Sequence, residues 1–332
     1  MTGPCVAQAL VPAASALMPM QAADATAQPR TCVETSLDTA GTSACATSLC
    51  LLILLPLLAL PALAQGFGEL KFERLAQGYR FTEGPAWSRE GGYLVFSDTP
   101  SDRLLQWAPG SAVTVYRIDA HGPAGNAFDA QGRLYTCETR TRRVTRTDKN
   151  GKIEVLAEAW EGKRLNAPSQ IVVSRNGHVY FTDPAFGEQN DHRQLDFHGV
   201  YHIPPKGPMT LVAKSASRPR GIALSPNGRT LYVSNVDDHN IRAWEVDRNG
   251  EAAGERVLAA KIEGAPGGIA VDAQGNLWVA AKGIAVYSPE GKRVHLIEMS
   301  DVVSSLAFGD ADFKSLFITA RAVVFRARPD TQ

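Results

Sequence analysis

A repeat is the feature of this sequence that most constrains its fold. Six similar units begin 41, 44, 51, 47 and 37 residues apart, at Gly84, Gly125, Ser169, Arg220, Gly267 and Ser304. Each unit has a small residue, an apolar-rich run, a turn that usually contains Gly, a second strand such as LYVS or LWVA, and a third strand after a polar loop. Periods of about 40–50 residues with three or four strands each are typical of β-propeller blades. We therefore predict an all-β, six-bladed β-propeller that forms a single domain over residues 65–332.

The segment LKFERLA, residues 70–76, lies before the first unit. We expect it to supply the outer strand of the last blade, because an open ring would leave unpaired strand edges. No stretch keeps a 3.6-residue apolar period over three turns, so we expect no long helix.

Residues 1–64 have a different composition and read as an export leader. They contain one basic residue, Arg30, and end in the apolar run LCLLILLPLLALPALA. The final Ala-Leu-Ala has the small-x-small pattern of a signal-peptide cleavage site. We expect export to the periplasm or the outside of the cell with cleavage near Ala64. The alternatives are an uncleaved N-terminal membrane anchor and, for the unusual length, translation from a later start codon.

Composition argues against nucleic acid or anionic membranes as partners and against an internal disulfide in the propeller. The chain has 34 basic and 34 acidic residues, and this zero net charge gives no electrostatic reason to expect nucleic acid or an anionic membrane as a partner. Four of the five cysteines lie in the leader, so the propeller keeps only Cys137 and can form no internal disulfide. We expect Cys137 to be a buried apolar residue.

The repeat also predicts a ring of side chains. The innermost strand of each blade runs beside the central channel, so the residue just before it lies at the channel mouth. Alignment of the units gives this ring as Glu83, Ala124, Ser169, Arg220, Gly267 and Ser305. Four of the six are small, and the two charged residues have opposite signs.

The ordered pieces FTEGPAW, NAFDAQGRLYTCE, KRLNAPSQIVV, VYFTDPAFG, GIALSPNGRTLYVSN, GIAVDAQGNLWVA and LFITA resemble the senescence marker protein / gluconolactonase / luciferin-regenerating enzyme family. The resemblance runs from about Phe81 to Arg328. It implies a six-bladed propeller, and many such proteins hydrolyse sugar lactones or related esters with one divalent cation, often calcium, at the channel mouth. The cation would polarise the lactone carbonyl and activate a water molecule.

The chain departs from the family at the positions that hold the cation. The resemblance places the cation ligands at Glu83, Ser169, Arg220 and Gly267, where the family has an acidic residue, Asn, Asn and Asp, and it places substrate-contacting Asn residues at Ala124 and Ser305. Only Glu83 matches. Calcium takes six to eight oxygen ligands, and an arginine cannot deprotonate in a protein. We therefore expect no metal cofactor, and we predict that Arg220 replaces the cation and pairs with Glu83 across the channel.

Four functions remain open on this evidence. The first is a propeller that binds a sugar-derived or anionic small molecule through Arg220 and has lost catalysis. The second is a metal-free hydrolase of lactones or carboxylic esters, in which Arg220 polarises the carbonyl and Glu83 is the base. The third is a metal lactonase that holds calcium or another divalent cation through Glu83 and ligands rebuilt from Gln170, Asp98 or main-chain carbonyls. The fourth is lyase or synthase chemistry without a metal.

Other residues are assigned from their positions beside the ring. We expect ligand contacts from Ser169, Gln170, Asn126, Asn166, Arg164, Ser305 and His198. The long insertion EQNDHRQLDFHGVYH, which holds Asp191, His192, His198 and His202, is predicted to overhang the mouth as a lid. Asp129, Asp183 and Asp272 are predicted to cap turns. The sequence does not indicate an oligomeric state.

Overall fold

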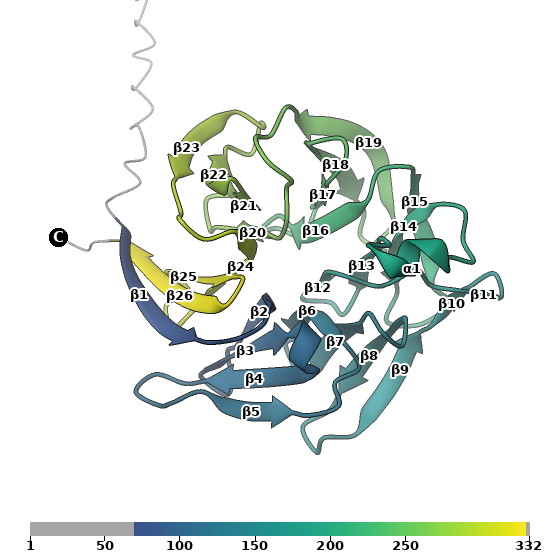
Figure 1. Ribbon diagram of the computed structural model, residues 1–332. Helices are drawn as coiled ribbons and strands as arrows, with labels where there is room; N and C mark the ends of the chain where they lie inside the picture. The colour runs from purple at the N-terminus through teal and green to yellow at the C-terminus, as the bar shows by residue number, and fades with distance from the viewer. Residues whose placement is uncertain (1–69, 330–332) are drawn as a thin grey trace, which may run out of the picture. The chain divides into compact units, whose positions relative to one another are not determined.

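The computed structural model describes residues 70–329, which form six four-stranded antiparallel sheets around a central axis and one two-stranded hairpin (Figure 1). This confirms the six-bladed propeller. From the axis outward, the blades are β2(Thr82–Ser88), β3(Tyr93–Asp98), β4(Arg103–Trp107), β5(Thr114–Arg117); β6(Pro123–Phe128), β7(Leu134–Glu138), β8(Arg143–Thr147), β9(Ile153–Ala157); β12(Ile171–Val173), β13(Val179–Asp183), β14(His198–Ile203), β15(Thr210–Ser215); β16(Pro219–Leu224), β17(Thr230–Asn235), β18(Asn240–Val246), β19(Ala252–Ala259); β20(Ile269–Val271), β21(Leu277–Ala281), β22(Gly283–Tyr287), β23(Arg293–Ile297); and β24(Val303–Gly309), β25(Ser315–Ala320), β26(Val323–Pro329), β1(Leu70–Gln77). They are called blades 1 to 6 in this order.

The ring is closed by the segment that precedes the first repeat. Strand β1 pairs antiparallel with β26, from Leu70 opposite Pro329 to Gln77 opposite Val323. The last blade therefore takes its outermost strand from the start of the described chain, as predicted. The innermost strands touch in cyclic order, with β2 contacting both β6 and β24.

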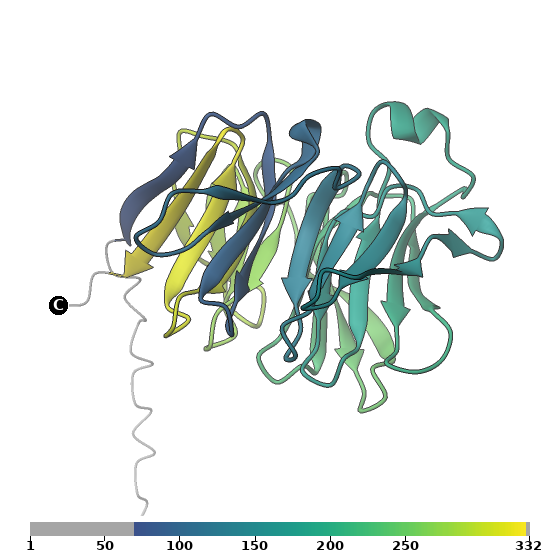
Figure 2. The ribbon, with the colours of Figure 1, turned by 90° about the horizontal axis from the view of Figure 1, so that it is seen from below.

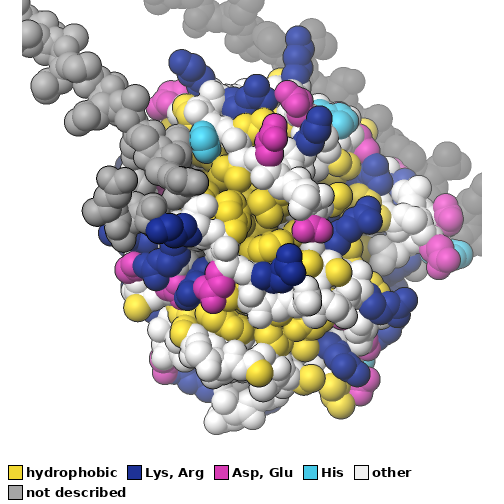
Figure 3. Space-filling model, turned by 60° about the vertical axis from the view of Figure 1, so that its left-hand side comes forward, with side chains coloured by type: hydrophobic (Ala, Val, Ile, Leu, Met, Phe, Trp, Pro, Cys, Tyr) yellow, Lys and Arg dark blue, Asp and Glu magenta, His cyan; other side chains and the backbone are white. Residues whose placement is uncertain are grey.

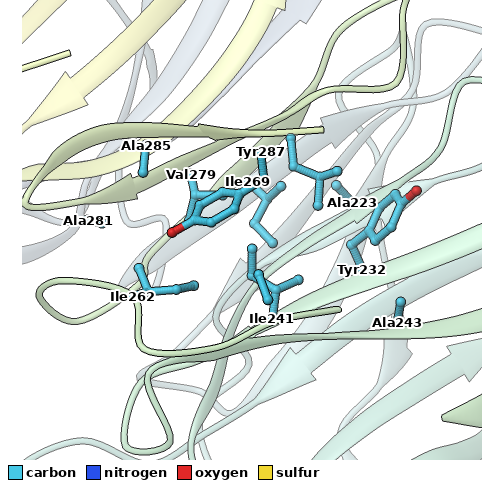
Figure 4. Close-up of a cluster of buried hydrophobic side chains, with 12 residues drawn as sticks. Ala223, Tyr232, Ile241, Ala243, Ile262, Ile269, Val279, Ala281, Ala285 and Tyr287 are labelled. Atoms are coloured by element: carbon cyan, nitrogen blue, oxygen red, sulfur yellow. The ribbon is translucent and has the colours of Figure 1, made fainter. Parts of the chain in front are cut away.

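Apolar side chains fill the spaces between neighbouring blades. Between blades 4 and 5, for example, Tyr232 and Ile241 pack against Ile269, Val279 and Tyr287 (Figure 4). These side chains come from the alternating buried positions of strands that belong to two different sheets. Cys137 lies in the equivalent cluster between blades 2 and 3 and is fully buried, as expected, and its burial raises the pKa of the thiol.

Hydroxyl groups connect the blades at the mouth end of the channel. Ser97, Thr182 and Ser234, each on the second strand of its blade, donate hydrogen bonds to the carbonyls of Ala124, Arg220 and Gly267 at 2.7, 2.8 and 2.6 Å. Each acceptor is the mouth residue of the following blade. These bonds satisfy buried carbonyls that have no strand partner and hold the mouth residues in place.

The register at the last blade corrects one prediction. The N–H of Gly268 donates to the carbonyl of Ser304 at 3.0 Å, just as the N–H of Gly125 donates to that of Ser169 at 2.6 Å. The position equivalent to Ser169 and Arg220 is therefore Ser304, and the assignment of Ser305 to the ring was wrong by one residue. We call Glu83, Ala124, Ser169, Arg220, Gly267 and Ser304 the mouth ring.

The residue after the mouth-ring position is glycine in four blades, because the next blade approaches too closely for a side chain. A Cβ atom on Gly221 would lie 2.1 Å from the carbonyl oxygen of Gly267, and one on Gly84 would lie 2.1 Å from that of Ala124. Both carbonyls are backbone atoms and cannot rotate away. In these blades the glycine is thus required by contact between neighbouring blades.

We expect Gly221→Ala to lower the free energy of unfolding by about 2–3 kcal/mol, because the methyl group must push two blades apart. Urea unfolding followed by tryptophan fluorescence measures this. The matched control is Gly228→Ala, whose methyl group meets nothing within 4 Å and whose φ is +70°. Its positive φ alone costs about 1 kcal/mol. Equal losses in the two variants would contradict the packing argument.

Two insertions rise from the mouth end of blade 3. The hairpin β10(Ala159–Trp160)–β11(Lys163–Arg164) lies before β12, and the helix α1(Glu188–Asp191) lies between β13 and β14. Seen from the side, α1 stands clear of the blades (Figure 2). Among residues 70–329 no helix has the length and apolar character needed to cross a membrane.

The flank in Figure 3 shows acidic and basic side chains interspersed with exposed apolar ones, in keeping with the zero net charge. The predicted leader, its cleavage near Ala64 and the alternative membrane anchor all concern residues outside the described range.

Candidate functional site at the channel mouth

The mouth ring brings its two charged residues into contact. Arg220 Nη2 donates a hydrogen bond to Glu83 Oε1 at 2.9 Å. Glu83 lies on β2 of blade 1 and Arg220 on β16 of blade 4, which are opposite blades of a six-bladed ring. The pair therefore spans the channel, and the predicted nitrogen-to-oxygen contact is confirmed.

Burial makes this pair energetically important. The Glu83 side chain is 9% exposed and the Arg220 side chain 21% exposed. An unpaired charge at this depth would lose hydration without compensation, so each residue offsets the desolvation of the other. In the part of the chain that the structure describes, only one of the five N–H donors of Arg220 bonds to a protein side chain, which leaves donors that can face the channel.

The ring offers few side-chain oxygens to a divalent cation. Ala124 and Gly267 have none, and Arg220 puts a fixed positive charge beside Glu83. The ring hydroxyls are those of Ser169 and Ser304, and Ser304 already donates to the Thr82 carbonyl at 2.7 Å. Within residues 70–329 no group of three or more His, Cys, Asp or Glu side chains is arranged to hold a metal. Asp98, considered above as a rebuilt ligand, accepts the N–H groups of Arg80 and Phe81 at 3.2 and 3.0 Å.

Blade 3 contributes polar atoms that have no protein partner. Asn166 Oδ1, Gln170 Nε2, His198 Nδ1 and Tyr201 Oη are buried without a hydrogen bond. Asn166 and Gln170 lie just before and at the start of β12, and His198 opens β14, so these three belong to the mouth end of the blade. Buried polar groups are nearly always satisfied, so these atoms are available to water or to a ligand.

Asn166 is held firmly although one of its atoms is free. Its amide nitrogen donates to the carbonyls of Asp183 and Phe197, both at 3.0 Å, which leaves Oδ1 as its unpartnered atom. The Asp183 carboxylate in turn accepts the backbone N–H groups of Asn166 and Ala167, both at 2.8 Å. Burial raises the pKa of Asp183 to about 7, although these two hydrogen bonds act to lower it. Asp183 therefore caps the loop before β12, and it does not cap a turn of its own as predicted.

His198 is 6% exposed, and burial, followed by the nearby positive charge of Arg193, lowers its pKa to about 4. Asp237 acts in the opposite direction and Arg218 in the same direction as Arg193. The imidazole is therefore neutral at pH 7. With a lone pair or an N–H at the unpartnered Nδ1, it suits a hydroxyl group of a ligand better than a charge.

The depressed pKa of His198 gives an expected dependence of stability on pH. Between pH 6.5 and about 4, His198 carries more bound proton in the unfolded state than in the folded state. The contribution of His198 is thus fully present above pH 6.5 and is lost as the pH falls towards 4, by about 3 kcal/mol in total. Urea unfolding of the wild type and His198→Gln across pH 4–7.5 measures it. Asp183, whose raised pKa has the opposite slope, is common to both proteins and cancels. Parallel curves would contradict this account.

Three predicted ligand contacts lie elsewhere in the structure. The Asn126 amide donates to the Gly84 carbonyl and Ser97 Oγ at 2.9 and 2.8 Å, and its Oδ1 accepts from Thr136, so Asn126 ties blades 1 and 2 together. Ser305 faces Gly268 of the preceding blade. Arg164 is exposed on β11 and donates to the Thr141 carbonyl at 2.9 Å, on the rim.

The insertion of blade 3 is fixed at its base. Arg142 of blade 2 donates to the His192 carbonyl at 3.0 Å, and the N–H of Arg164 donates to Gln194 Oε1 at 2.6 Å. The prediction that His202 belongs to this insertion was wrong. His202 lies in β14, is fully buried, and shares a 2.8 Å hydrogen bond with His178 at the other end of the blade.

The hydroxyls that support the mouth were missed, although the sequence carries a signal for them. Ser97-Asp98, Thr182-Asp183 and Ser234-Asn235 each end the second strand of a blade. The hydroxyl in each pair bonds the next mouth-ring carbonyl. In two of the pairs the carboxylate caps the loop that enters the innermost strand of the same blade. This repeated dipeptide predicts which residues position the ring.

Comparisons with known proteins show which proteins share the family and the fold of this chain. The profile of the SMP-30/gluconolactonase/LRE-like region matches residues 81–322. A gluconolactonase of Zymomonas mobilis is 31% identical over 290 residues, which cover 78% of this chain and 81% of the relative. A gluconolactonase structure from Xanthomonas campestris is 33% identical, with a TM-score of 0.73 over 79% of this chain and 90% of that one. A calcium-binding regucalcin from Agrobacterium tumefaciens shares the fold at 19% identity, with a TM-score of 0.65 over 77% of this chain and 93% of that one.

Proposed function

Since the chain belongs to the SMP-30/gluconolactonase/LRE-like family, we propose that its channel mouth binds a sugar-derived lactone or sugar acid through Arg220, in the place where relatives hold a divalent cation. The observation that carries the proposal is the 2.9 Å hydrogen bond between Arg220 and Glu83 across the channel. A guanidinium meets carbonyl and carboxylate oxygens with directed N–H donors, and so it can hold the group that a cation would otherwise bind.

The rest of the proposed site recognises hydroxyl groups. Asn166 Oδ1 accepts, Gln170 Nε2 donates, and neutral His198 can do either at Nδ1. These three atoms are buried and unpartnered, and they come from the blade next to Arg220. A polyol chain or ring that carries one oxyanion or carbonyl matches one guanidinium and several neutral hydrogen-bonding groups. A ligand that is only apolar does not.

The second candidate function is hydrolysis of such a lactone, and the identities of 31% and 33% to gluconolactonases favour it. In that reaction the oxygen of water adds to the carbonyl carbon and the ring C–O bond breaks, with the proton passing to the leaving oxygen. Arg220 would stabilise the oxyanion, which is where charge develops. The residues present offer a donor for this role, while Glu83 Oε1 is occupied by the guanidinium.

The experiment compares binding with turnover. Isothermal titration with D-gluconate is expected to give saturable binding to the wild type, and the double variant Glu83→Gln/Arg220→Met is expected to lose it. Arg256→Gln removes an exposed arginine of β19 and is expected to bind as the wild type does. Acid release from glucono-δ-lactone in a pH-stat, with and without chelator, then separates the two functions.

Each outcome decides between the candidates. Gluconate binding without turnover supports the binding protein, and turnover that is insensitive to chelator and lost with Arg220 supports the metal-free hydrolase. Turnover that chelator abolishes, or gluconate binding that the double variant keeps, would overturn the role given to Arg220.

A further inference from the structure

A hollow lies between the turns of blades 3 and 4, at the end of these blades opposite the mouth ring. Strands β12 and β16 start at the mouth and lead to these turns, so the hollow opens on the other face of the propeller. It has a volume of about 800 Å³. Its lining is formed by the turn after β12, the turn after β16 and the turn after β18, with Val172, Val173, Leu224 and Val246 as apolar wall.

The three turns share one sequence pattern that uses up their side-chain oxygens. They read Ser174-Arg175-Asn176-Gly177, Ser225-Pro226-Asn227-Gly228 and Asp247-Arg248-Asn249-Gly250. Ser174 Oγ accepts the N–H of His178 at 2.9 Å, Ser225 Oγ accepts that of Thr230 at 2.9 Å, and Asp247 Oδ1 accepts that of Glu251 at 2.8 Å. The turn chemistry thus occupies the acceptors within the turns.

Hydrogen-bond donors are what these turns leave for a ligand. Arg175, Arg229 and Arg248 line the hollow, and all three are exposed. None of the ion pairs or hydrogen bonds found in residues 70–329 involves their guanidinium groups. Arg218 and Arg242 of blade 4, in contrast, are both paired with acidic side chains. Asn176 and Asn227 each accept a Ser hydroxyl at Oδ1, at 2.6 and 2.7 Å, so their amide N–H groups are left over.

The charge balance of the hollow is positive in a chain that has no net charge. Three arginines and one acidic residue, Asp247, line it, and the Asp247 carboxylate is held by the backbone of its own turn. Arginine forks bind oxyanions with two parallel hydrogen bonds, and an apolar wall next to them favours a ligand with an apolar body. Phosphate and carboxylate groups share the required chemistry.

We propose that this hollow, defined by Arg175, Arg229, Arg248 and their apolar wall, binds a small organic anion that carries a phosphate or carboxylate on an apolar ring or chain. The anion contacts the arginines at the open side, and its apolar part covers the valines and Leu224. This site is separate from the mouth ring, because the full length of β12 or β16 lies between them. It rests on none of the residues assigned to the mouth.

Isothermal titration of the full-length protein with phenyl phosphate, and separately with inorganic phosphate, tests the proposal. Phenyl phosphate is expected to bind about fivefold or more tightly than phosphate, because its ring covers apolar surface. Arg175→Gln/Arg229→Gln is expected to weaken phenyl phosphate binding about tenfold or more, because it removes two charge-assisted donors. The control Arg74→Gln/Arg256→Gln removes the same charge from exposed positions on β1 and β19 and is expected to leave the affinity unchanged.

Benzoate in place of phenyl phosphate shows whether the site takes carboxylates as well as phosphates, and binding of either anion supports the site. The proposal is overturned if neither anion binds, or if both double variants weaken binding equally, which would indicate a general effect of charge. It is also overturned if Arg220→Met abolishes binding while Arg175→Gln/Arg229→Gln keeps it, since the anion would then occupy the mouth.

Discussion

Replacing Arg220 with alanine is expected to lower the free energy of unfolding by about 3–5 kcal/mol, because it leaves a buried carboxylate without its partner. Glu83 is only 9% exposed in the intact pair, so water compensates little for the lost guanidinium. The Arg220 carbonyl still accepts from Thr182 in the variant, so the backbone of the mouth keeps its support. Urea unfolding at pH 7.5, above the range in which His198 titrates, measures the change.

A double variant separates the charge pair from the packing of the arginine. Glu83→Gln/Arg220→Met removes both charges and is expected to recover most of the stability, since a buried pair is often worth little more than a neutral replacement. Arg256→Ala, an exposed arginine, is expected to change stability by less than about 0.5 kcal/mol. A cost of Arg220→Ala no larger than that of Arg256→Ala would show that the contact across the channel contributes nothing.

Rebuilding the cation ligands of the family is expected to create a calcium site at the mouth ring. The variant Ser169→Asn/Arg220→Asn/Gly267→Asp places two amides and a second carboxylate around Glu83. Oxygen ligands of this kind suit calcium, and a cation that binds only the folded state at 100 times its Kd adds about 2.7 kcal/mol to its stability. Thermal melts with calcium and with chelator measure the difference, which is expected to be absent in the wild type.

The structure predicts a cost for this variant as well. A Cβ atom on Gly267 would lie 2.7 Å from the Ser304 carbonyl oxygen and 3.3 Å from Ala280 Cβ. The calcium-free variant is therefore expected to be less stable than the wild type, by about 1–3 kcal/mol. The same triple change in a Glu83→Gln background is the control and is expected to lose the calcium response. A calcium response that survives Glu83→Gln would place the ion elsewhere.

The repeat made most of the fold predictable, and with it the central contact of the site. Alignment of six units put Glu83 and Arg220 three blades apart, and in a six-bladed ring that separation means opposite sides of one channel. No local feature of either residue indicates the contact. The closing strand β1 was equally predictable, since a propeller without it would expose the edge of β26.

The errors came from neighbouring positions that sequence alone could not distinguish. Ser304 and Ser305 are both small, and only the hydrogen bond from Gly268 shows which of them occupies the ring. Asn126 lies two residues beyond the mouth position, where its amide meets blade 1 and not the channel. His202 continues the alternation of a strand that begins at His198, but its place next to a long insertion suggested a loop.

The sequence pattern could not predict the hydrogen-bond partners of buried polar atoms. Asn166 and Gln170 were predicted to lie near a ligand because they flank the ring, yet which of their atoms is left free depends on tertiary contacts. Asp183 and the Phe197 carbonyl satisfy the amide of Asn166 and leave its oxygen. The arginines of the opposite hollow were likewise unremarkable in sequence, since their pocket forms only when three turns from two blades meet.

Metal content of the purified protein, combined with calcium titration of its thermal unfolding, tests the central claim most directly. If Arg220 occupies the place of the cation, elemental analysis finds no stoichiometric calcium or other divalent ion, and neither calcium nor chelator shifts the melting temperature. One ion per chain, with a melting temperature that rises with calcium and falls with chelator, would contradict the claim and indicate that Glu83 ligates a metal ion.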